Sequence, residues 1–520
     1  MTAKIRNIVG LLAVAAGTHA QQRAPFTLVG HIQNFDLVPP GCNQPLCGAE
    51  MKVNGIVVTI PANTIMVMPA TYLTPHDIFK GPHGRPAAGP FPQVVAGRPV
   101  SGLALNDPAP FTPIAPYEAS LSGNIDGATY VAGLVTISQQ SLNTTSGYIK
   151  AINNLTGEIT VGPLLANPAI SAVVRLNDPE LLAADGSGLG FGRYGRAESA
   201  DERFTSDQGN PTVRATTGYP MCIPRMNMAT TDPRCPESNR LKNPDGTYSS
   251  RFTVGPVANG DGITPGAPAC PSCDPTRLVP FEVGDYIAFS GTLAKDSAGM
   301  IYISAHTMVA SLGIYTSPNT RPVYVALDVS LIGTGGIAFP GVPQETGPRG
   351  AGGAIPTTRL KVEGVITDPS KAVDVFAVDF LSTGTGVERS PALLSVGPMN
   401  RPPFGRWRLV RDRSNFLPPP REIRVRVAGI PPGQVSVATV ANGLIPGEFS
   451  APVAEYIFPE GTVFGQPEVP LNFENLCFLL KGTGPLTTLG RGSTAPPGPP
   501  VLVLSPWPNS GHIQPQVTCP

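Results

Sequence analysis

Two stretches of this sequence mix arginines with aromatic side chains, a combination that can bind a planar, acidic molecule. A guanidinium group pairs with an anionic oxygen, and it also stacks on flat rings. The first stretch is Phe191–Arg225, in which acidic and apolar residues lie between the arginines. The competing interpretation is a solvated loop with internal ion pairs, because loops commonly carry charge without function.

The second stretch is Arg401–Arg426, where several arginines surround Trp407. Its end, Arg424–Val427, alternates arginine with valine. This alternation predicts a half-buried strand with an exposed basic face, so a structural role competes with ligand binding.

A smaller polar group, Ser138–Asn143, ends a predicted strand and includes Gln139 and Gln140. Its amides and hydroxyls can orient a ligand at the mouth of a barrel. They can equally end the strand through local hydrogen bonds.

Searches for familiar catalytic motifs find nothing. The sequence has no Gly-x-Ser-x-Gly elbow, no His-Glu dipeptide and no histidine pair at metal-ligand spacing. Gly190–Gly195 matches a dinucleotide-binding fingerprint in letters, but no strand or βαβ unit surrounds it. We therefore expect neither a metal nor a cofactor.

The elements that must position these residues are strands. The 58 glycines and 61 prolines deny the chain long helices, and one short helix is expected near Glu198–Arg203. Strand-like runs repeatedly contain a central glycine, which often marks a bulge or a barrel corner. The prediction is an all-β protein of several small β-barrel or β-sandwich domains with long Pro/Gly-rich loops. The glycine pattern occurs at Gly30, Gly123, Gly291 and Gly364.

Low-complexity connectors suggest the domain limits. Gly186–Pro220, Asn227–Pro275 and Gly333–Pro356 are rich in glycine or proline. We predict a signal peptide over 1–20, N-terminal β domains with a long functional loop over 21–220, a central β-barrel domain over 221–335 and a C-terminal β domain with a Pro-rich tail over 356–520.

The start of the chain predicts export. Lys4 and Arg6 precede a short apolar run, and cleavage is expected after Ala20. Eight cysteines in an exported chain predict four disulfides. Eight cysteines can pair in about 105 ways, so the sequence alone does not fix the connectivity. Asn143 and Asn154 each begin an N-glycosylation triplet. Proximity favours the pairs Cys42–Cys47, Cys222–Cys235, Cys270–Cys273 and Cys477–Cys519.

The charge pattern limits the partners. Net charge is +0 and charged residues are 14% of the chain, so neither nucleic acid nor an anionic membrane is an expected partner. The Pro-rich tail carries no lipid-anchor signal, and we expect no membrane anchor.

Four segments together resemble a known group of exported proteins. They are Met51–Ala70, Val131–Asn143, Gly218–Arg225 and Pro403–Arg408. The group includes the fungal intermolecular hetero-Diels–Alderases of tropolonic sesquiterpenoid (meroterpenoid) biosynthesis, and the matching segments fall within residues 30–480.

The resemblance implies a cofactor-independent pericyclase. A hydroxymethyl-tropolone would lose water to give an ortho-quinone methide, which would add to an alkene of a humulene-type sesquiterpene alcohol. The substrates would be the small-molecule partners, and no residue role can be transferred from the group.

Such a site needs donors for the quinone oxygen, an acid for dehydration and apolar walls for the terpene. The first arginine-rich stretch contains all three types. As donors we assign Arg196, Arg203, Tyr219 and Arg225, as the acid Asp201, Glu202 or a tyrosine, and as walls Phe204, Met221 and Met226. Gln139, Gln140 and Trp407 are further substrate-binding candidates.

Two other functions fit the same sequence. One is a secreted, non-catalytic β-domain protein that binds glycan or protein. The other is a hydrolase with a dispersed carboxylate pair, because the paired acids of glycosidases have no fixed spacing.

Overall fold

The computed structural model describes nineteen parts of the chain. These are residues 24–42, 47–61, 64, 66–69, 72–80, 93–139, 144–163, 171–178, 194–195, 201–207, 210–224, 232–256, 267–333, 360–380, 386–388, 394–397, 404–411, 422–430 and 444–457. Strands dominate them, so the predicted all-β class is confirmed.

The first module is a closed five-stranded barrel. The long strand β1 pairs antiparallel with both β2 and β8, and β9 closes the barrel by pairing in parallel with β3. The order β1-β2-β3-β9-β8 is that of a Greek-key barrel of the OB type. Its elements are β1 (Ala24–Val38), β2 (Gly48–Val53), β3 (Ile56–Ile60), β4 (Met66–Val67), β5 (Tyr72–Leu73), α1 (Pro75–Lys80), β6 (Val94–Val95), β7 (Arg98–Pro99), β8 (Glu118–Asp126) and β9 (Thr129–Ser138).

The second module repeats this topology. Strand β10 pairs with β11 and β18, and β19 closes the barrel in parallel with β12. Residues 177–285 are inserted between the third and fourth barrel strands, and β13 from this insertion joins the sheet beside β19. The barrel strands are β10 (Thr145–Asn153), β11 (Glu158–Gly162), β12 (Ala172–Leu176), β13 (Val213–Ala215), β18 (Tyr286–Lys295) and β19 (Ile301–Ala310).

Glycines sit at matching bulges in the two barrels, as the sequence predicts. The register slips by one residue opposite Gly123 and again opposite Gly291. A Cβ on Gly123 would lie 2.0 Å from the carbonyl oxygen of Val131, and one on Gly291 would lie 2.3 Å from that of Ser304. The partner backbone therefore approaches too closely for any other residue.

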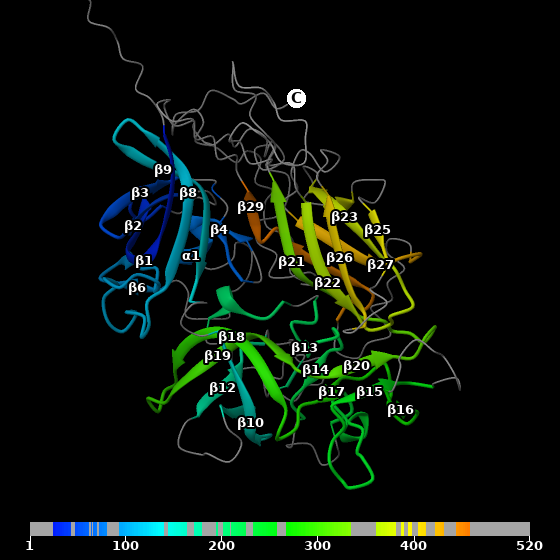
Figure 1. Ribbon diagram of the computed structural model, residues 1–520. Helices are drawn as coiled ribbons and strands as arrows, with labels where there is room; N and C mark the ends of the chain where they lie inside the picture. The colour runs from blue at the N-terminus through cyan, green and yellow to red at the C-terminus, as the bar shows by residue number, and fades with distance from the viewer. Residues whose placement is uncertain are drawn as a thin grey trace, which may run out of the picture.

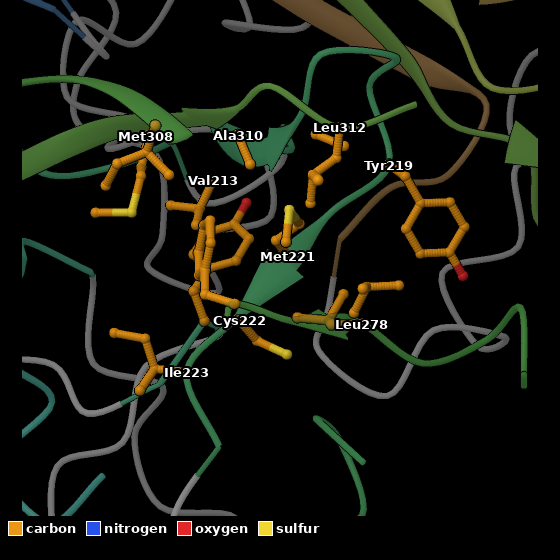
Figure 2. Close-up of a cluster of buried hydrophobic side chains, with 14 of the residues drawn as sticks. Val213, Tyr219, Met221, Cys222, Ile223, Leu278, Met308, Ala310 and Leu312 are labelled. Atoms are coloured by element: carbon orange, nitrogen blue, oxygen red, sulfur yellow. The ribbon is translucent and has the colours of Figure 1, made fainter. Parts of the chain in front are cut away.

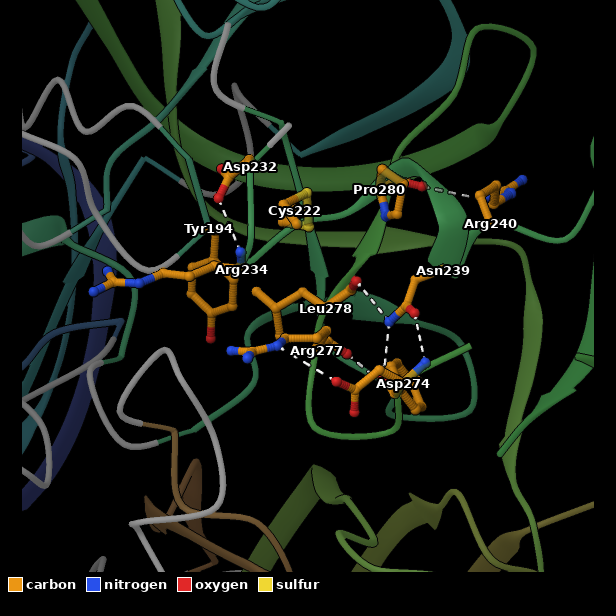
Figure 3. Close-up of a disulfide and its surroundings, with 12 residues drawn as sticks. Tyr194, Cys222, Asp232, Arg234, Asn239, Arg240, Asp274, Arg277, Leu278 and Pro280 are labelled. Atoms are coloured by element: carbon orange, nitrogen blue, oxygen red, sulfur yellow. Dashed lines mark hydrogen bonds and ion pairs between the residues drawn. A yellow bond between two sulfur atoms is a disulfide. The ribbon is translucent and has the colours of Figure 1, made fainter. Parts of the chain in front are cut away.

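The insertion is held together by two disulfides and buried polar contacts. Cys222–Cys235 and Cys270–Cys273 are formed here, and Cys42–Cys47 in the first barrel. Beside the Cys222 disulfide, the Asn239 amide donates to the carbonyls of Asp274 and Leu278 at 2.9 and 3.2 Å (Figure 3). Three predicted pairings are thus confirmed, and the fourth lies outside the described residues. The elements are η1 (Glu202–Phe204), β14 (Met221–Cys222), η2 (Glu237–Asn239), β15 (Arg251–Val254), β16 (Ala269–Cys270) and β17 (Val279–Pro280), followed after β19 by β20 (Gly313–Thr316), which pairs with β15.

The third module is a sandwich of two sheets. One has the order β26-β22-β21-β29, and the other β24-β23-β27-β28 with β25 beside β23. Trp407 is fully buried in the core between them. Its strands are β21 (Val325–Gly333), β22 (Leu360–Ile366), β23 (Val373–Phe380), β24 (Gly386–Glu388), β25 (Leu394–Val396), β26 (Arg406–Arg411), β27 (Glu422–Val427), β28 (Glu448–Pro452) and β29 (Glu455–Ile457).

The three modules form a triangle, with the first barrel at upper left, the second below and the sandwich at upper right (Figure 1). The domain boundary predicted at residue 220 falls inside the second barrel's insertion, because β12 and β19 pair across it. The boundary predicted after 335 separates β21 from its partner β22. Of the helix predicted near Glu198–Arg203, only the end lies within the described residues, where Glu202–Phe204 forms the 3-10 helix η1. The sequence does not predict helix α1.

Candidate functional site

A cavity of about 420 Å³ lies where the three modules meet. Ligand pockets usually span 300–1,000 Å³ and prefer domain interfaces. The first barrel contributes β4 and β9, the second β13, β18 and β19, and the sandwich β21 and β28. A ligand bound here would contact all three modules.

Two β-bulges direct side chains into this cavity. In β19, Ala305 pairs with Gly291 and Thr307 with Ser290, so His306 is the inserted residue. In β21 the register skips Asp328 in the same way. One inserted residue reverses the alternation of side chains between the two faces of a strand. Each bulge therefore places its extra side chain on the face opposite to the one that regular pleating would give. His306 and Asp328 both line the cavity.

Arg214 on β13 supplies a buried cation to the cavity. Its side chain is 11% exposed and forms an ion pair with Asp328 of the third module, whose side chain is 39% exposed. The Nη1 of Arg214 also donates to the carbonyl of Ala215 at 3.2 Å. The ion pair therefore joins the second and third modules at the cavity wall.

His306 presents a neutral imidazole. Its Nδ1 lies 3.0 Å from the Thr307 hydroxyl. Burial lowers the pKa of the ring to about 4, because the protein surroundings disfavour the charged form. His306 is therefore uncharged at neutral pH, with Nε2 as its second polar atom.

Hydroxyl groups complete the polar side. The Thr212 Oγ1 is buried and has no hydrogen-bond partner within the described part of the chain. The Ser290 hydroxyl lies 3.1 Å from that of Thr144. A buried hydroxyl without a partner is a group that a ligand can satisfy.

Other residues that line the cavity are apolar. Met68 comes from the first barrel, Leu327 from β21, and Phe449 and Val453 from the β28 region. Three of them are buried against protein, while Leu327 is partly exposed. The cavity therefore suits a molecule with a polar, oxygen-bearing end and a hydrocarbon body.

Ser290, His306 and Asp328 have the composition of a hydrolytic triad, but each contacts a different group. His306 contacts Thr307, Ser290 contacts Thr144 and Asp328 contacts Arg214. A triad needs the base to contact both the nucleophile and the acid. Asp328 is also the sole carboxylate among the described lining residues, so the cavity lacks the acid pair of a glycosidase.

The predicted donor Arg203 is occupied by the protein. It is 1% exposed, and its Nη2 and Nε donate to Asp201 at 2.6 and 2.9 Å. Its Nη1 donates to the carbonyls of Ile78 and Ser101 in the first module at 3.0 and 2.8 Å. Arg203 and Asp201 therefore fasten η1 to the first barrel, and neither lines the cavity.

The predicted apolar walls are divided between two cores. Phe204 packs in the first barrel with its ring stacked on Tyr117, at 5.1 Å between centroids. Met221 and Tyr219 lie in the core of the second module (Figure 2). The Tyr219 hydroxyl donates to the carbonyls of Pro275 and Arg277. The structure does not bring these residues together at one surface.

Two other candidates are also structural. Gln139 donates to the carbonyl of Ala115 at 3.0 Å and accepts from the amide of Leu293 at 2.8 Å, which links the two barrels. Trp407 fills the sandwich core.

The expected exposed basic face of β27 is buried and neutralised. Arg426 is buried and pairs with Glu388 and Glu448, and Arg424 also pairs with both. The alternation was read correctly as a strand, but the second sheet face is covered by carboxylates from β24 and β28.

Asn154 lies partly exposed in the turn between β10 and β11. The Thr156 hydroxyl of its triplet donates to Glu158 at 3.0 Å. The remaining predicted site residues lie outside the described residues: Arg196, Arg225, Met226, Gln140, Asn143, Cys477 and Cys519.

Comparison with known proteins adds no assignment. No protein-family model matches the chain, and no curated protein or solved structure is significantly similar to it. Among the described residues, no three His, Cys, Asp or Glu side chains gather as metal ligands would. Within the same residues, no helix is long and apolar enough to cross a bilayer.

Proposed function

We propose that this chain is a cofactor-independent pericyclase whose substrate site is the three-module cavity. It would dehydrate a hydroxymethyl-tropolone and direct the hetero-Diels–Alder addition of the resulting quinone methide to a humulene-type sesquiterpene alcohol. The observation that carries the proposal is the pairing of a buried cation, Arg214, with an apolar wall inside one cavity. Arg203 and Tyr219, the donors predicted from the sequence, do not line this cavity.

The cavity offers what each reactant needs. The Arg214 guanidinium can bind the adjacent oxygens of a tropolone, because its planar fork matches paired oxygens. The walls at Met68, Leu327 and Phe449 can hold the hydrocarbon ring of the terpene. Holding diene and alkene together can remove roughly 7–11 kcal/mol of the barrier at best. A donor on the quinone oxygen polarises the diene as negative charge develops there.

Export is part of the same proposal. Three disulfides are compatible with an oxidising compartment, where such bonds persist. We propose that residues 1–20 direct the chain into the secretory pathway and that Asn154 carries glycan.

The test is to incubate the purified protein with a hydroxymethyl-tropolone and a humulene alcohol, and to resolve the adducts by chiral chromatography. Quinone methides also react unaided, so the signal is the excess of one stereoisomer over the racemic background. We expect Arg214→Met to lower the enzymatic rate by about 10²–10³, the usual effect of losing one electrostatic donor in a dry site.

Two controls separate this effect from folding. Arg98→Met removes an arginine that is 72% exposed on the first barrel and should leave the rate unchanged. Arg214→Met combined with Asp328→Asn avoids leaving the carboxylate without its cation. Binding of the tropolone without any stereoselective adduct would instead identify a non-catalytic small-molecule-binding protein. Absence of binding to wild-type protein would refute the cavity as the site.

A further inference from the structure

His306 lies outside the core of the second module and lines the cavity. The bulge in β19 removes it from the core alternation, in which Ile303 and Ala305 precede it and Met308 and Ala310 follow. It is the one imidazole among the described residues that line the cavity. Bulges are commonly found where a side chain is directed at an active site.

Of the two ring nitrogens of His306, one has a hydrogen-bond partner among the described residues. Thr307 contacts Nδ1 at 3.0 Å, which fixes the ring orientation, and Nε2 has no hydrogen bond to a described residue. Arg214, a cation, and Asp328, its carboxylate partner, are the charged groups that share the cavity with the ring.

Resting on the proposed function, we infer that His306 transfers the proton in the dehydration step. Nε2 accepts the proton from the tropolone hydroxyl, and the electron pair released moves through the ring to expel the hydroxyl of the hydroxymethyl arm. The exocyclic C–O bond breaks, an exocyclic C=C bond forms, and the ring C–O becomes C=O. The departing hydroxide takes the proton from His306 and leaves as water. The imidazole returns to its neutral form, and no oxidant or reductant is consumed.

Arg214 favours the first half of this transfer, and burial of the ring favours the second. Arg214 stabilises the oxyanion that deprotonation creates, because a nearby cation favours the ionised form. Burial makes the protonated imidazole acidic, so it releases its proton readily to the departing hydroxide. The cycloaddition itself moves no proton and should not need His306.

The dehydration and the cycloaddition can be tested separately, because only the dehydration should need His306. His306→Asn places an amide near the Nδ1 position, within reach of Thr307, but has no atom at Nε2. With hydroxymethyl-tropolone as substrate, we expect its rate to fall by about 10²–10⁴, the usual contribution of a general acid–base group. With quinone methide released by light from a masked precursor, the same variant should form the adduct at the wild-type rate and with wild-type stereochemistry. His31→Gln, which changes a half-exposed imidazole in the first barrel, is the matched control and should equal wild type in both assays.

The outcomes are distinguishable. Equal rates for His306→Asn and wild type with hydroxymethyl-tropolone would overturn the role of His306 while leaving the proposed function intact. Loss of both activities in a folded variant that still binds the tropolone would also overturn it, because the defect would then not be confined to dehydration. Wild-type protein that gives only the unaided rate and the racemic adduct from both substrates would refute the proposed function.

Discussion

Arg203→Met tests whether this arginine is structural, as its contacts indicate. Methionine keeps most of the side-chain length but supplies no donor. The change leaves the Asp201 carboxylate without its ion-pair partner and the carbonyls of Ile78 and Ser101 without a donor. Removing one partner of a buried ion pair typically destabilises a protein by about 3–5 kcal/mol. The Asp201 side chain is 14% exposed, so water can partly replace the lost cation, and we expect about 3 kcal/mol.

Amide hydrogen exchange measures this loss where it occurs. Because each 1.4 kcal/mol corresponds to a factor of ten, the amides of α1 and β1 should exchange about 10²-fold faster in the variant. Arg98→Met, on the same barrel, removes an exposed pair with Asp36 and should cost about 0–1 kcal/mol. If the amides of the two variants exchange at the same rates, the contacts of Arg203 do not stabilise the barrel. Arg203 would then remain a candidate for ligand binding.

Three further outcomes follow from the structure. Gly364→Ala should destabilise the sandwich by at least about 1–3 kcal/mol in urea unfolding, because a Cβ would lie 2.1 Å from a carbonyl oxygen of β21. A Cβ on Gly397 would meet no atom within 4 Å, so Gly397→Ala should leave the stability unchanged. His306 binds a proton near pH 6.5 when unfolded but near pH 4 when folded, so stability is full above pH 6.5 and falls by about 3 kcal/mol as pH drops to 4. His306→Gln should reduce the change in melting temperature over this pH range, and an unchanged slope would contradict the lowered pKa of His306. Replacing Cys222 and Cys235 with serine should cost about 2–4 kcal/mol, and detection of a free thiol at either position in the denatured native protein would contradict the disulfide.

The local elements were predictable because they depend on local chemistry. Glycine within strands predicts bulges at four positions. The register shifts beside Gly123, Gly291 and Gly364, whereas Gly30 pairs regularly with Ala119. Domain limits were not predictable in this way. The pairing of β12 with β19 joins residues more than 120 positions apart, and no local pattern records which distant strand will close a barrel.

The candidate site was only partly accessible from sequence. Arg214 belongs to the arginine-rich stretch, and Ser138, which ends the predicted strand, also lines the cavity. Arg203, one of the four predicted donors, binds backbone carbonyls of another module, a contact that the sequence does not reveal. For His306 the sequence holds a signal: the apolar residues Ile303 and Ala305 are followed by Met308 and Ala310, and this change of phase is typical of a bulge.

The insertion in the second barrel has a consequence for how the chain is made. Strands β10 to β12 leave the ribosome about 110 residues ahead of β18, which at 5–20 residues per second is roughly 5–20 seconds. Throughout that interval the three strands form at most an open sheet, with both edges unpaired and prone to intermolecular pairing. The insertion can meanwhile fold around its own short-range disulfides, whose cysteines are 13 and 3 residues apart. The nascent chain is therefore most vulnerable to aggregation before β19 emerges, and a chaperone that covers the free edges of β10 and β12 should raise the yield of folded protein more than one that acts after synthesis.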